Sequence, residues 1–233
     1  MREVIFDTET TGLDPKTGDR MVEIGCVEMV GRVETGRTYH AYYNPERDMP
    51  SAAEAVHGLS SAFLSGKPLF SETAGELIEF LGDAPLVAHN AGFDFGFLNA
   101  ELERIGREPI SMDRMVDTVA IARKKHPGAK LSLDALCTRY GIDGSHRVKH
   151  GALLEAELLA QVYVELTGGR QIGLELASQT EVMVTETVDL KSAAPHQETP
   201  KQFREARPHA ASDSELTRHR EFVAGIKDAI WAR

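Results

Sequence analysis

The chain has 233 residues and a formal net charge of −10, with 42% hydrophobic and 27% charged residues. This length supports one sizeable core plus a tail, and the acidic balance argues against a free-standing nucleic-acid binder, which is usually basic. No apolar run approaches the roughly 20 residues that span a bilayer, and the acidic N-terminus is unlike a signal peptide. We therefore expect a cytoplasmic protein without membrane contact, in which Cys26 and Cys137 are buried, reduced thiols.

Hydrophobic patterning predicts a mixed α/β fold. Strands are expected at 3–10, 21–30 and 36–44, with a short apolar strand at 85–89. Helices are expected at 52–56, 73–81, 93–105, 117–125, 132–140 and 152–166. The early strands are close in sequence, which favours an antiparallel meander, and the later alternation favours helices on both faces of one sheet.

The composition changes after residue 169. Residues 191–211 contain almost no large apolar side chains and are typical of a linker. A capping box, from Ser212 to Glu215, then predicts the start of a terminal helix. The apolar side chains of that helix fall on or beside one stripe: Leu216, Phe222, Val223, Ile226, Ile230 and Trp231.

Two carboxylates occupy the first predicted strand. Asp7 and Glu9 are two residues apart, so both side chains point to the same face. Carboxylates side by side among apolar neighbours repel each other and lose hydration, and a divalent cation relieves both costs. The alternative is a solvated face at the edge of the sheet.

Two further acids are predicted on apolar helix faces. Asp94 shares a face with Phe97 and Leu98, although a helix-start acid that complements the macrodipole is the alternative. In the helix at 152–166, Glu155 falls on the buried side. The solvent stripe of that helix consists of Glu157, Gln161 and Glu165.

A histidine precedes this helix. His150 lies next to Gly151, within two turns of Glu155, and can take a proton from water near neutral pH. His146, in a basic loop, is the competing candidate. Four acids and one histidine predict a site for two divalent cations, Mg²⁺ or Mn²⁺, with His150 as general base. Zinc is less favoured, because one histidine and no cysteine join the group.

These segments resemble a known family. The stretch VIFDTETTGL resembles the first motif of the DEDDh, or DnaQ-like, exonucleases; VAHNAGFDFGFL and KHGALLEAELLA resemble the second and third. The resemblance implies an RNase H-like fold with a five-stranded mixed sheet and two-metal 3′→5′ hydrolysis. The implied metal ligands are Asp7, Glu9, Asp94 and Glu155, and His150 is the implied base. The implied contacts with the terminal nucleotide are Thr10, Gly12, Leu13, Val56, His57 and Phe93.

One position departs from the family pattern, which has aspartate where this chain has Glu155. Glutamate keeps the charge and the oxygen ligands but is one methylene longer. Because Mg²⁺ tolerates geometric error poorly, this exchange bears on the level of activity.

Within the superfamily, residues 2–170 are most similar to the epsilon, proofreading subunits of bacterial DNA polymerase III. That resemblance implies a DNA substrate with a single-stranded or frayed 3′ end and a clamp-binding peptide at 171–176, where Gln171, Leu174 and Leu176 match. It also implies that the helix at 212–233 binds the polymerase III alpha subunit. The expected division is an exonuclease domain at 1–170, the peptide at 171–176, a linker at 177–211 and the terminal helix.

Two other functions compete with this one. The chain could be an independent nuclease acting on RNA or repair intermediates, or a weakly catalytic scaffold that joins clamp to polymerase. The tail favours a polymerase subunit over the first, and the other four matching site residues argue against the second.

Overall fold

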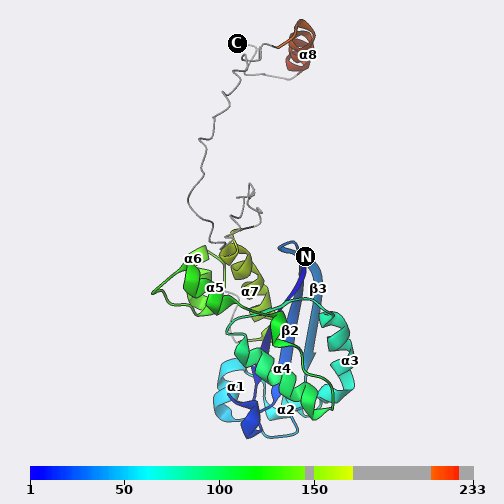
Figure 1. The fold of residues 1–233 in the computed structure, drawn as a ribbon, viewed down its shortest axis with the longest axis vertical. Helices are drawn as coiled ribbons and strands as arrows, with labels where there is room; N and C mark the ends of the chain where they lie inside the picture. Colours follow the sequence, from blue (N-terminus) through cyan, green and yellow to red (C-terminus); the bar gives the residue numbers. More distant parts are fainter. Residues whose placement is uncertain (145–149, 170–210, 226–233) are drawn as a thin grey trace, which may run out of the picture. The chain divides into compact units, whose positions relative to one another are not determined.

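A computed structural model describes residues 1–144, 150–169 and 211–225 (Figure 1). The chain divides into two compact units, Met1–Ser178 and Gln179–Arg233, which are described separately. The first unit carries the sheet and all but one of the described helices.

A five-stranded mixed sheet forms the centre of the first unit, with the strand order β3-β2-β1-β4-β5. The strands are β1 (Arg2–Thr10), β2 (Met21–Val30), β3 (Val33–Tyr42), β4 (Leu86–Ala88) and β5 (Met115–Asp117). The first three form the predicted antiparallel meander, while β4 and β5 continue the sheet in parallel from β1. The predicted fold class is confirmed.

The helices cover both faces of the sheet, as the alternation predicts. Their bounds are α1 (Ser51–His57), α2 (Ser61–Leu64), α3 (Phe70–Leu81), α4 (Gly92–Arg104), α5 (Thr118–Lys125), α6 (Leu133–Tyr140) and α7 (Ala152–Leu166), with 3-10 turns at Pro15–Thr17 and Met112–Arg114. One core cluster joins α3 and α4 to Val4 and Phe6 of β1; another joins α7 to Ile5. Alternate side chains of β1 thus pack into two different cores, one on each face of the sheet.

A glycine lets α7 approach the sheet. A Cβ atom at Gly25 of β2 would lie 2.2 Å from the backbone nitrogen of Leu153, so any side chain there would displace the first turn of the helix. This close approach brings the beginning of α7 onto the face that carries Asp7 and Glu9.

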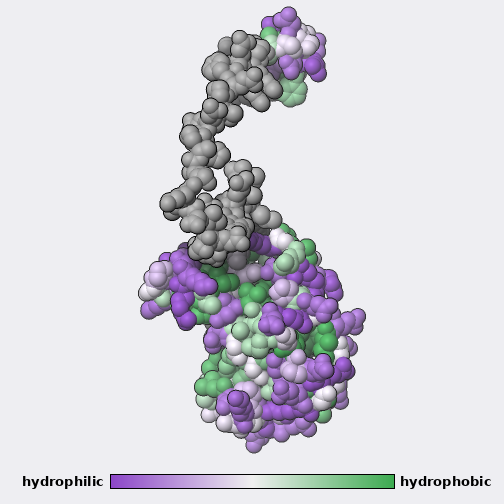
Figure 2. All heavy atoms as spheres, in the orientation of Figure 1, coloured by the Kyte–Doolittle hydropathy of each residue, from purple (hydrophilic) through white to green (hydrophobic). Residues whose placement is uncertain are grey.

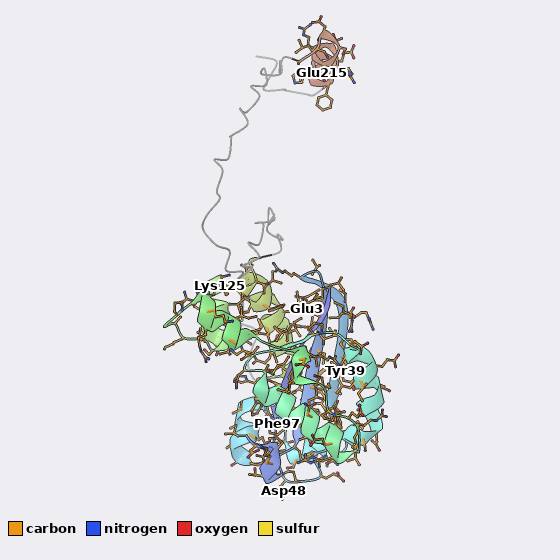
Figure 3. The ribbon with its side chains drawn as sticks, viewed as in Figure 1. Glu3, Tyr39, Asp48, Phe97, Lys125 and Glu215 are labelled. Atoms are coloured by element: carbon orange, nitrogen blue, oxygen red, sulfur yellow. The ribbon has the colours of Figure 1, made fainter. Side chains whose placement is uncertain are left out.

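The far end of α7 is closed by α5 and α6. Lys125, labelled in Figure 3, donates to the carbonyls of Glu165 (2.6 Å) and Leu166 (3.2 Å), where helical carbonyls lack intrahelical partners. The ammonium group of Lys125 therefore caps the C-terminal end of α7.

Several elements differ from the sequence prediction. Strand β3 begins at Val33 rather than residue 36, α3 begins at Phe70 rather than residue 73, and neither β5 nor α2 was predicted. Both missed elements have at most four residues, too few for a hydrophobic period to be recognised. Cys26 and Cys137 are both buried, as expected. Among the described residues, no helix has the length and apolar character needed to cross a bilayer.

The second unit contains α8 (Asp213–Ala224). Ser212 and Glu215 form the predicted capping box, so the helix starts where the sequence places it. Leu216 and Phe222 are exposed, Phe222 to 71%, whereas Val223 is buried. The visible surface of α8 is largely hydrophilic with a small hydrophobic part (Figure 2).

Candidate active site

The site lies where β1 and β4 end. Because β4 runs parallel to β1, the turn that follows it returns the chain beside the end of β1. Asn90 adopts a positive φ of 65° in this turn, and Asp117 Oδ1 accepts from its backbone N–H at 3.1 Å. Helix α4 starts two residues later, and Asp94 in its first turn accepts a 2.7 Å hydrogen bond from Thr8 Oγ1.

Helix α7 and the residues just before it contribute Glu155 and His150. Glu155 is only 5% exposed although it is an acid. Of the predicted solvent stripe, Gln161 and Glu165 are exposed, whereas Glu157 is only partly exposed. The burial of Glu155 is therefore confirmed, and the solvent stripe is confirmed at two of its three positions. His150 Nδ1 lies 2.8 Å from Glu155 Oε1, so the two predicted residues contact each other directly.

All five predicted catalytic and metal-binding residues line one cavity of about 330 Å³. They are Asp7, Glu9, Asp94, His150 and Glu155. Residues separated by almost 150 positions in the chain thus face the same space, which is the arrangement that their motifs imply.

The electrostatics of the cavity indicate crowded carboxylates. Burial raises the pKa of Asp7 well above its ordinary value, and the charges of Asp94, Glu9 and Glu155 raise it further. Burial also raises the pKa of Asp94 to about 7, against the lowering effect of the hydrogen bond from Thr8. Because of their burial and proximity, these acids bind protons more readily than isolated carboxylates do.

A divalent cation fits this donor set. Oxygen ligands with mutual repulsion are what Mg²⁺ or Mn²⁺ relieves. Within the described ranges, no three Asp, Glu, His or Cys side chains are already gathered tightly enough to enclose an ion. One carboxylate oxygen of Glu155 lies against the imidazole of His150 in this arrangement.

The raised pKa of Asp94 predicts how the stability of the metal-free protein depends on pH. Between its ordinary value of 3.8 and its folded value of about 7, the folded state binds more protons than the unfolded state. The stability that Asp94 contributes is therefore fully present below its ordinary pKa. It is lost as the pH rises through the folded pKa. In EDTA we expect the Tm to fall by about 3–8 °C between pH 5 and pH 8.

The measurement is thermal unfolding of the wild type and of Asp94→Asn across this pH range. The variant should show a clearly smaller decrease, because its side chain cannot ionise. Asp134→Asn, at an exposed position of the same cavity, is the control and should follow the wild type. Equal slopes for wild type and Asp94→Asn would contradict the assignment.

A second cavity, of about 570 Å³, adjoins the first, and both are lined by Thr8, Glu9 and Phe93. It contains every residue predicted to contact the terminal nucleotide: Thr10, Gly12, Leu13, Val56, His57 and Phe93. Pro50, Ala52 and Ala53 add further apolar lining, while Thr11 and Asp19 add polar groups. The space is suited to a base and a sugar next to the carboxylates.

Sequence reasoning missed several residues of the site. Thr8 lies between the two acids of β1, and only the structure shows that it holds Asp94. His89 lines the cavity that contains Asp7, Asp94 and Glu155, called the acid cavity below. It contacts Thr118 Oγ1 at 2.8 Å, and burial lowers its pKa. Asp134, in the first turn of α6, also lines the acid cavity. A polar residue at the end of a strand was the available signal for His89.

The predicted partner-binding residues are only partly described. Leu216 and Val223 lie on α8. The others lie outside the described residues: Gln171, Leu174, Leu176, Ile226, Ile230 and Trp231. His146, the competing base, also lies outside them.

Sequence comparison identifies related proteins. The family model described as Exonuclease (RNase_T) matches residues 4–163. A DNA polymerase III subunit epsilon of Rickettsia felis is 47% identical over 229 residues, covering 97% of both chains. The protein of that name from Escherichia coli is 40% identical over 225 residues, covering 94% of this chain and 90% of its own.

Solved structures share the fold. The nuclease domain of 3'hExo, a DEDDh family member bound to rAMP, has a TM-score of 0.62 at 17% identity; the match covers 71% of this chain and 91% of that one. Exonuclease X in complex with 5′-overhanging duplex DNA has a TM-score of 0.53 at 23% identity and covers 70% and 90%. At these identities the likeness establishes the architecture alone.

Proposed function

Because this chain belongs to the exonuclease family that includes the epsilon subunits of DNA polymerase III, we propose that it removes mispaired nucleotides from the 3′ end of a growing DNA strand. The observation that supports this most directly is the carboxylate-lined cavity that adjoins an apolar one. The first suits phosphodiester hydrolysis, and the second suits the terminal nucleoside. We place the reaction in the cytoplasm, where a bacterial replication protein works.

The four acids are the proposed ligands for two divalent cations, Mg²⁺ or Mn²⁺. Asp7 and Glu9 reach the cavity from β1, Asp94 from α4 and Glu155 from α7. When bound, the cations would lower the pKa of the attacking water and stabilise charge on the phosphate and the leaving oxygen. The chain's own part is to hold these oxygens in place, with Thr8 fixing Asp94.

His150 is the proposed general base. Its Nδ1 contacts Glu155 Oε1, so Nε2 is the atom proposed to take the proton from water. The carboxylate orients the ring and stabilises its charged form after the transfer. Glu155 Oε2 can then serve a cation while Oε1 holds the imidazole, an arrangement that the longer glutamate side chain makes possible.

The second cavity is the proposed site of the terminal nucleotide. Leu13 and Val56 are exposed at this cavity, where their side chains can contact a base. Phe93, which lines both cavities, separates the base from the phosphate. A frayed, mispaired end reaches this space more readily than a paired end, because fewer base contacts must be broken.

The proposal is tested with two primer–templates that differ only in whether the primer terminus is paired. We expect release of nucleoside 5′-monophosphates with Mg²⁺ or Mn²⁺, faster from the mispaired terminus, and none in EDTA. An RNA strand of the same sequence serves as the comparison for substrate class. Equal rates on paired and mispaired ends, or faster hydrolysis of the RNA, would contradict proofreading.

Two partner contacts belong to this function. We propose that the helix at 212–233 binds the polymerase III alpha subunit and that residues 171–176 bind the sliding clamp. Exposed apolar side chains on α8, Leu216 and Phe222, support the first. A tethered nuclease needs little DNA affinity of its own, which agrees with the net charge of −10.

Truncation separates these contacts. Removing residues 212–233 should abolish co-elution with the alpha subunit and leave hydrolysis of single-stranded DNA unchanged. Gln171→Ala with Leu174→Ala should weaken clamp binding and spare the alpha contact. Size-exclusion chromatography of each mixture is the measurement, and co-elution of the shortened chain with alpha would refute the role of the helix.

A further inference from the structure

A fifth buried acid lies beside the site without a role in the function proposed above. Two rows of Cα partners cross the antiparallel strands: Glu9, Glu23 and Tyr42 form one, and Asp7, Gly25 and His40 form the next. Residues two apart on a strand share a face, so both rows face α7. Glu23 is only 2% exposed and lies next to Glu9 in its row.

Two side chains of β3 hold Glu23. His40 Nε2 lies 2.7 Å from Glu23 Oε1. Tyr42 is the Cα partner of Glu23 on β3, and the pKa of its hydroxyl is raised first by burial and then by the charge and hydrogen bond of Glu23. The rings of His40 and Tyr42 are 4.7 Å apart and support each other. Glu23 is thus a buried carboxylate fixed from the side away from the site.

The other side of Glu23 meets the start of α7. Gly151 is the N-cap residue and has no side chain with which to cap the helix. A Cβ atom at Gly151 would lie 3.9 Å from Glu23 Oε1. The first N–H groups of a helix lack intrahelical acceptors and form its positive end. The Glu23 carboxylate of β2 therefore lies close to the N-terminal end of α7, where the N-cap residue has no side chain.

The charge of Glu23 has a cost in this place. It is one of the groups that raise the pKa of Asp7, so it adds to the repulsion among the acids. An apolar residue would avoid both that repulsion and the desolvation of a buried charge. The attraction between the Glu23 carboxylate and the positive end of α7 offsets this cost in free energy.

We propose that Glu23, held by His40 and Tyr42, is a positioning residue that anchors the first turn of α7 and so sets the places of His150 and Glu155. The inference rests on the proposed roles of those two residues. It requires no contact between Glu23 and the substrate. Loss of its charge should loosen the first turn of α7, slow the chemical step and leave DNA binding intact.

The test compares full-length Glu23→Gln with Glu28→Gln. Glu28 is the matched control, because it is buried on the same strand but pairs with Arg2 and Arg37, beside Val4 on the other face. The first readout is amide hydrogen exchange without metal at Glu155, whose N–H donates to Gly151 O. Exchange there should be about three- to tenfold faster in Glu23→Gln, relative to Val162 in the same helix.

The second readout is kinetic. Single-turnover hydrolysis of a short single strand by Glu23→Gln should be about tenfold slower at saturating Mg²⁺, while its Kd for the strand in EDTA stays within about twofold of the wild type. Glu28→Gln should match the wild type in exchange and in rate per folded molecule. His40→Gln keeps Glu23 but removes the imidazole that contacts it, and should show the same pattern more weakly. It replaces Glu23→Gln in the test if that variant does not fold.

Unchanged exchange at Glu155 in both Glu23→Gln and His40→Gln would overturn the proposal, as would equal effects in Glu28→Gln. His150→Gln separates this from the proposed function. Full activity of His150→Gln would remove the role of His150 as base, whereas faster exchange in Glu23→Gln would still support the anchoring of α7.

Discussion

Replacing Asp7 and Glu9 together by alanine should abolish 3′→5′ hydrolysis and leave the protein folded. The change removes two of the four acids proposed as metal ligands in the acid cavity. Without them a cation loses half of its protein ligands, and the rate should fall by about a thousandfold or more, roughly 4 kcal/mol in the barrier. The apolar residues of β1 are untouched, and less repulsion remains around Asp94.

The measurement is single-turnover hydrolysis with Mg²⁺, together with the Tm in EDTA. We expect the Tm of the double variant to equal or exceed that of the wild type. Glu3→Ala is the control, because Glu3 is an acid on the same strand whose side chain accepts from the Tyr163 hydroxyl at 2.7 Å instead. It should keep the wild-type rate. Undiminished hydrolysis by the double variant would remove these acids from the mechanism.

Glu155 should control the choice of metal. Its side chain is one methylene longer than the family's aspartate, and in the structure it contacts His150 at 2.8 Å. Mg²⁺ demands near-octahedral geometry, and we expect Mn²⁺ to tolerate distortion better. The wild type should therefore have a higher ratio of Mn²⁺ to Mg²⁺ activity than Glu155→Asp. The difference should be about 1–3 kcal/mol in the barrier, or ten- to a hundredfold in rate.

Glu155→Ala should change the rate more than Glu155→Asp does. It removes a charge as well as the contact with His150. Glu157→Ala is the matched control on the same helix, at a position more exposed than Glu155, and should have almost no effect. All four proteins are compared in single-turnover hydrolysis with each metal. A damaging Glu157→Ala beside a silent Glu155→Ala would show that the other acid belongs to the site.

The sequence alone indicated the acids of the site because each one breaks a local pattern. Glu155 is a charge on the apolar side of a helix whose polar side is elsewhere, and Asp7 and Glu9 interrupt a strand of buried residues. Burial of an unpaired charge is costly, so such positions require an explanation that periodicity can reveal. The long elements were predictable for the same reason, since α7 carries four turns of hydrophobic period.

Local patterns carry no information about which segments meet. Thr8 faces Asp94 only because β4 pairs in parallel with β1 and returns the chain to the end of that strand. Glu23 reaches the start of α7 only because Gly25 lets the helix descend onto β2. Lys125 caps α7 only because the end of that helix lies beside α5. These contacts depend on strand order and on close packing between distant segments, which only the tertiary structure decides.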